Sequence, residues 1–130
     1  MEGHAVSVID RARTAYDPVN QAVRCPKSIE YEAFVRVTRA LNQASVPSPT
    51  QTVKLAKAVH DNRRLWTMLA ADVASGGNRL SQETRAGLFY LAEFTVAHSR
   101  KVLKREATVD ALIDVNTAVM GGLRSSVRPT

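Results

Sequence analysis

Few residues in this sequence have the types and spacing that catalysis needs. His60 and Asp61 are adjacent, so on a helix their side chains point about 100° apart and cannot form a direct catalytic pair. His98 lies on an apolar stripe, where a histidine is more often a hydrogen-bonded core residue than a general base. Asp110 and Asp114 are one turn apart, but acidic residues at the start of a helix also favour its dipole. The sequence therefore predicts no catalytic residue and a protein that is not an enzyme.

Ligands for metals and cofactors are equally sparse. The 130 residues include three histidines and a single cysteine, Cys25, which excludes an intramolecular disulfide and leaves no Cys/His zinc pattern. The pairs Gly76–Gly77 and Gly121–Gly122 follow predicted helices, whereas a phosphate-binding loop leads from a strand into a helix. We therefore expect no metal and no cofactor.

The basic charge of the chain does not form one patch. There are 18 basic and 12 acidic residues, for a formal net charge of +6. The densest basic group is Arg100, Lys101, Lys104 and Arg105, which falls at the expected C-terminal turns of a helix, where cations complement the dipole. No aromatic residues are interleaved with these charges, as stacking on bases requires. Direct binding of nucleic acid is therefore not expected, and a steep loss of RNA affinity with salt would contradict this expectation.

The elements that must position the remaining candidates are all helices. Apolar residues recur at helical spacing almost throughout, and no stretch alternates as a strand does. Five helices are predicted: residues 3–16, Pro26 to about Ala44, a third capped by Thr50 or Thr52, a fourth from the Ser81 cap to Glu106, and a fifth from the Thr108 cap to Gly121–Gly122. The fold class is thus all-α: a small antiparallel bundle of about five helices, forming one domain over residues 1–130.

The predicted core is formed by Trp66 and Leu69 against Leu88, Leu91 and Leu112. Leu103 is also assigned to the inward face of the fourth predicted helix. The apolar stripe of residues 1–18 is thin, so the first helix is expected to be mobile or ordered only by a partner. Residues 124–130 are expected to fray. Ser75 to Asn78 are expected to supply a left-handed turn after the third helix.

Two amides interrupt apolar stripes. Asn62 precedes Trp66 by one turn, and Asn116 lies among Leu112 and Val119. A buried amide must be hydrogen-bonded, because an unpaired one costs a few kcal/mol. These residues therefore predict either a core network that fixes the helix register or a contact with a partner.

No segment has the length or composition of a membrane anchor. The apolar runs are only a few residues long, far below the ~20 that span a bilayer, and the first residues mix charged with apolar side chains, unlike the core of a signal peptide. We therefore expect no membrane insertion and a location in the cytoplasm.

Four short motifs carry a resemblance to a known family. DNRRLW at 61–66, with RVTRAL at 36–41 before it and DVN at 114–116 and MGGL at 120–123 after it, resembles the FlaF family, flagellar biosynthesis regulators of alphaproteobacteria. The resemblance covers residues 10–123. It implies a small cytoplasmic protein that binds flagellin, supports its secretion and acts beside FlbT, which represses flagellin translation through the messenger's leader. It marks signature positions without saying whether they bind or pack: Asn62, Arg63, Leu65, Trp66, Asp114 and Asn116.

A flagellin client suggests a mechanism. The resemblance implies a client whose terminal segments are disordered before assembly and become amphipathic helices, which a hydrophobic groove between helices could hold. Basic residues at the rim, namely Lys57, Arg63 and Arg64, would steer acidic client surfaces. Two alternatives stay open: a regulator that acts on flagellin mRNA through FlbT, and an adaptor that docks FlbT or an export component through a helix face. A homodimer through such a face also stays open.

Overall fold

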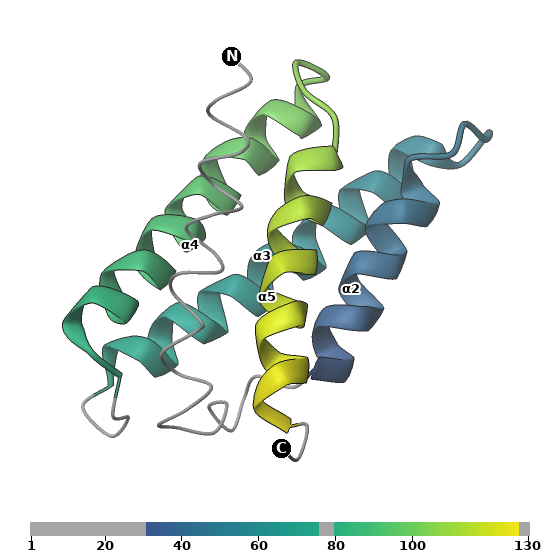
Figure 1. Cartoon of the computed structure of the whole chain (residues 1–130). Coiled ribbons are helices and arrows are strands. Elements are labelled where there is room, and N and C mark those ends of the chain that lie inside the picture. Colours follow the sequence, from purple (N-terminus) through teal and green to yellow (C-terminus); the bar gives the residue numbers. More distant parts are fainter. Residues whose placement is uncertain (1–30, 76–79, 128–130) are drawn as a thin grey trace.

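The computed structural model of this chain describes residues 31–75 and 80–127 (Figure 1). These residues form four helices and contain no strand: α2 (Tyr31–Ala44), α3 (Gln51–Ala74), α4 (Gln82–Leu103) and α5 (Asp110–Val127). The all-α prediction is therefore confirmed. The predicted helix over residues 3–16, the predicted start at Pro26 and the glycine turn at 76–77 lie outside the described residues.

The four helices form an up-and-down bundle, in which each helix runs antiparallel to the next (Figure 1). Helix α2 packs against α3 and α5, and α4 packs against the same two helices from the opposite corner. The α4–α5 pair is the least closely packed, since the two helices meet near their connection and diverge away from it (Figure 1). The antiparallel arrangement predicted for the later helices is confirmed.

Local chemistry explains where most helices begin. Ser81 caps α4 as predicted, because its hydroxyl accepts a hydrogen bond of 3.1 Å from the Thr84 N–H. Thr108 accepts one of 3.3 Å from the Asp110 N–H at the start of α5. Thr50 occupies the cap position of α3, but its side chain makes no capping bond. The two predicted caps of α4 and α5 are thus confirmed, and that of α3 is right only in position.

The end of α4 differs from the prediction. The helix stops at Leu103 and not at Glu106, because the Glu106 N–H turns back to donate to the Lys101 carbonyl over 2.8 Å. Arg105 takes a positive φ of 63° to allow this turn, a conformation that usually belongs to glycine. Its guanidinium Nη2 donates to Thr52 Oγ1 over 2.9 Å, which ties the α4–α5 connection to the first turn of α3.

The prediction that Gly121–Gly122 ends the last helix is wrong. Helix α5 continues through both glycines to Val127, so the backbone of residues 124–127, expected to fray, is helical. Glycine weakens a helix by about 1 kcal/mol relative to alanine but does not end it unless the chain needs a left-handed residue. No described glycine has a positive φ. Residues 128–130 lie outside the described residues.

The core consists of two apolar clusters. The first contains Phe34, Leu65, Trp66, Leu69, Val73, Leu80, Leu88, Leu91, Val115 and Val119. The second cluster lies nearer the α2–α3 and α4–α5 connections. It contains Leu41, Ala44, Ala58, Val59, Val102, Val109 and Leu112. The predicted core pairs are therefore correct except for Leu112, which belongs to the second cluster. Each helix also carries a buried polar residue between or beside its residues of the two clusters, and we call this set the polar layer: Thr38, Asn62, Thr95 and Asn116.

Two predictions about α4 need correction. Leu103 is 46% exposed, because it lies beside the inward-facing Val102 at the end of the helix, beyond the packing of the neighbouring helices. His98 is only half-buried, yet the hydrogen bond predicted for it exists, between its Nε2 and the Thr108 carbonyl at 2.9 Å. Its ring stacks on Phe94, with ring centroids 5.3 Å apart.

Candidate functional site

Four of the residues singled out in the sequence lie in the interior. Asn62, Trp66 and Asn116 are fully buried, and Leu65 is 6% exposed. The Trp66 Nε1–H donates to Asn116 Oδ1 over 2.9 Å, and the Asn116 Nδ2–H donates to Asn62 Oδ1 over 2.7 Å. The structure thus shows the core network and places these four side chains in the interior.

Thr38 is a member of this network that the sequence interpretation missed. Asn116 Nδ2 also donates to Thr38 Oγ1 over 3.1 Å, so three helices share one set of hydrogen bonds. The signal was present, since Thr38 lies one turn after Phe34 and one turn before Leu41 on the buried side of α2. Phe34 packs edge-on against Trp66, with ring centroids 5.8 Å apart, which fixes α2 against the indole.

The predicted basic rim lies on α3, but it does not surround one pocket. Lys57 is exposed and forms an ion pair of 3.0 Å with Asp61, one turn further along the helix. Arg64 is exposed, whereas Arg63 is half-buried on the flank of α3 that continues toward Thr67. Lys57 and Arg64, seven positions apart, therefore share one face of α3, whereas Arg63 lies about 100° further round the helix.

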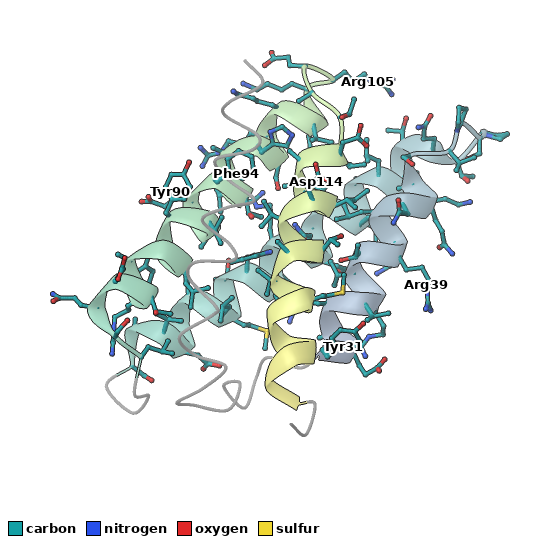
Figure 2. The ribbon with its side chains drawn as sticks, viewed as in Figure 1. Tyr31, Arg39, Tyr90, Phe94, Arg105 and Asp114 are labelled. Atoms are coloured by element: carbon teal, nitrogen blue, oxygen red, sulfur yellow. The ribbon has the colours of Figure 1, made fainter. Side chains whose placement is uncertain are left out.

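Asp114 lies on the outer side of α5, away from the buried side chain of Asn116 on the same helix. It is exposed on α5, the helix diagonally opposite α3 in the bundle (Figure 2). Arg39 on α2 is exposed as well, and its side chain points away from the bundle (Figure 2). The structure therefore divides the predicted site into a buried network, the outer side of α3 and the carboxylate of Asp114 on α5.

An apolar groove between α3 and α4 is the best candidate for a binding site. Its volume is about 430 Å³. Thr67 and Ala70 of α3 form one wall, and the residues contributed by α4 are Phe89, Ala92, Glu93, Val96, Ala97 and Arg100. The side chains are mostly small, which allows another backbone to approach closely, and Phe89 supplies a larger apolar surface.

The sequence interpretation did not find this groove. Phe89, Ala92 and Val96 form a second apolar stripe on α4, beside the buried stripe of Leu88 and Leu91. A helix that packs only on one side needs no such second stripe. The second apolar stripe of α4 could therefore have indicated the groove from the sequence. The α3 wall could not have been predicted in this way, because it depends on how the two helices pack.

A second cavity lies at the end of the bundle that holds the α2–α3 and α4–α5 connections. Its volume is about 440 Å³, and its walls include apolar Ala44, Leu55 and Val102. Arg105 and Thr52 also line it, and their hydrogen bond joins the α4–α5 connection to α3 at this end. Figure 2 shows Arg105 at that connection. Most of the cavity lining comes from helix ends and connections, in contrast to the continuous helical walls of the groove.

The described residues contain no group of three histidine, cysteine or carboxylate side chains arranged to hold a metal ion. Within residues 31–75 and 80–127, no helix is both long enough and apolar enough to cross a membrane.

Comparison with known proteins gives one family. The model of a family described as flagellar protein FlaF matches residues 12–123, which is most of the chain. No curated protein and no solved structure gives a match.

Proposed function

We propose that this chain, which belongs to the FlaF family of flagellar proteins, binds flagellin before assembly and supports its secretion. The observation that carries the proposal is the groove between α3 and α4, which is open to solvent and lined mainly by apolar side chains. A protein that meets flagellin before export acts in the cytoplasm, and we include that location in the proposal.

The groove has the shape that an amphipathic helix fills. Its α4 wall runs from Phe89 to Arg100, a length of about 16 Å at 1.5 Å per residue. This length accommodates about three turns of a second helix. Helices of this kind bind in grooves through apolar residues at positions i, i+3 and i+7, and Phe89, Ala92 and Val96 have the same spacing.

The binding energy should come from apolar contact, with charge in a supporting role. Phe89 and Val96 are half-buried, so part of their apolar surface meets water when the groove is empty of a partner. Arg100, exposed at one end of the groove, would raise the association rate of an acidic segment. Binding should therefore weaken only modestly when salt is raised.

The polar layer supports the site from within. Its hydrogen bonds join α2, α3 and α5, and they reach full distance and direction in only one alignment of the helices. Helix α3, which carries one wall of the groove, is therefore held in place by Asn62 and Trp66. In this proposal the buried signature residues act by positioning α3.

The proposal extends to FlbT. The role suggested by the FlaF resemblance couples flagellin secretion to control of flagellin synthesis, so we propose that FlbT is a second partner. The exposed basic outer side of α3, with Lys57 and Arg64, is separate from the groove and available for such a contact. A double change of Lys57 and Arg64 to glutamate should weaken FlbT binding and leave flagellin binding intact.

The test is a binding titration of purified protein with flagellin, repeated with flagellin that lacks its terminal segments. We expect binding that persists at high salt and disappears with those segments. Thr67→Glu should weaken binding about tenfold or more, because it sets a charge in the apolar wall. Thr117→Glu is the matched control, since Thr117 is an exposed threonine on α5, far from the groove lining.

Two results would refute parts of the proposal, and a third would add a competitor for the groove. No binding to flagellin, with FlbT or flagellin messenger captured instead, would move the function to control of translation. Equal effects of Thr67→Glu and Thr117→Glu would show that flagellin binds elsewhere. A dimer that dissociates on addition of flagellin would show that a second copy of the chain competes for the same face.

A further inference from the structure

We infer that the groove favours one direction of its partner helix: parallel to α4, with an acidic C-terminal turn at Arg100. This inference rests on the proposed binding of a flagellin helix and adds the direction and charge pattern of that helix. It follows from the uneven distribution of charge along the groove.

The two ends of the groove differ in charge. At one end lies the apolar Phe89, and at the other lies the guanidinium of Arg100. Arg63 lies outside the groove lining: one turn before Thr67 on the antiparallel α3, it lies near the middle of the α4 wall and not at its Arg100 end. Within residues 31–75 and 80–121, Arg100 has no acidic partner within ion-pair distance.

The Arg100 cation favours one end of a helix over the other. The last turn of a helix has carbonyl groups without partners and a partial negative charge, whereas the first turn is partially positive. A partner helix parallel to α4 places its negative end at Arg100. The reverse direction brings a positive end against that cation, so it is disfavoured.

Glu93 adds a second constraint on the partner. It lies in the groove lining seven positions before Arg100 on α4, about 10 Å along the helix axis. A parallel helix has the same rise, so a basic residue about seven positions before its acidic end would face Glu93. The groove therefore fits a helix with an apolar stripe, a base near its middle and an acid in its last turn.

Site-specific spin labels can determine the direction. The single cysteine, Cys25, is replaced by serine, and a new cysteine is placed beyond either end of the groove: Ala86→Cys before Phe89, or Lys104→Cys after Arg100. Both positions are exposed on α4 or at its end. The probe is an isotope-labelled peptide of a flagellin terminal helix, observed by NMR.

We expect the label at 104 to broaden the C-terminal half of the peptide and the label at 86 to broaden its N-terminal half. The opposite pattern, or equal broadening of both halves by each label, would overturn the inferred direction while leaving groove binding intact. Absence of broadening from both labels, with the peptide bound, would place the peptide outside the groove. Absence of binding to full-length flagellin by the unlabelled protein would instead refute the proposed function.

A charge exchange tests the acidic turn independently. Arg100→Glu should weaken the binding of an acid-ended peptide about tenfold, and changing that acid to lysine should restore most of the affinity. Lys101→Glu is the control, because Lys101 is exposed next to Arg100 but lies outside the groove lining. Equal losses for both variants would show a general charge effect and overturn the contact with Arg100.

Discussion

Replacing Asn116 by alanine should destabilise the bundle far more than the same change at Asn62. The Asn116 amide uses both N–H groups and its oxygen, in bonds to Thr38, Asn62 and Trp66. Its loss leaves the Trp66 N–H and the Asn62 oxygen buried without partners. Each such group costs about 1–3 kcal/mol, so we expect a loss of about 3–5 kcal/mol in the free energy of unfolding.

The change at Asn62 is milder for a structural reason. Asn62 Nδ2 is buried and has no hydrogen-bond partner, so truncation removes one unpaired group while creating another. Asn116 keeps its bonds to Trp66 and Thr38 in that variant. We therefore expect Asn62→Ala to cost about 1–2 kcal/mol.

Urea titration measures both costs directly. The chain has one tryptophan, Trp66, which is fully buried and reports unfolding by fluorescence, with circular dichroism as a second signal. Thr117→Ala, at an exposed position next to Asn116, should change the stability by less than about 0.5 kcal/mol. A cost below about 1 kcal/mol for Asn116→Ala, or equal costs at Asn62 and Asn116, would refute the role given to the network.

Three further changes test single features of the helices by the same titration. Gly121→Ala should stabilise the protein by about 0.5–1 kcal/mol, because no atom lies within 4 Å of the added Cβ; destabilisation would show that the α5 helix is not continuous there. Ser81→Ala should cost about 1 kcal/mol through loss of the bond to the Thr84 N–H, and a neutral result would contradict the cap. Arg105→Gly relieves about 1–2 kcal/mol of left-handed backbone strain but loses the exposed hydrogen bond to Thr52. We therefore expect the free energy of unfolding to rise by less than about 1.5 kcal/mol. A clear loss of stability would mean that the hydrogen bond contributes more than the strain costs.

Sequence patterns were informative where one residue and its close neighbours decide the outcome. Ser81 caps α4 because a hydroxyl at that position meets the N–H groups of the first turn of the same helix. Asn62 and Asn116 were predicted to face inward because each interrupts an apolar stripe. A core network of hydrogen bonds was one of the two interpretations offered for these amides, and the structure shows such a network.

Features that depend on two helices at once were not predictable in this way. Thr38 escaped notice because a threonine fits an exposed or a buried position equally well, and only the approach of Asn116 from α5 gives its hydroxyl a partner. The groove escaped notice because Thr67 and Ala70 have no distinctive chemistry until α4 lies beside them. Gly121 was misjudged because glycine permits a helix end without requiring one.

The division of the core into two clusters means that each helix packs in two successive stretches. Each cluster is an apolar contact between helices, whereas near the junction the hydrogen bonds of Asn116 hold α5 to α2 and α3. The groove spans both stretches, since Phe89 lies beside the first cluster and Arg100 lies toward the second. A helix bound along the groove would contact both stretches at once, so that amide hydrogens near both clusters would exchange more slowly in the complex than in the free protein.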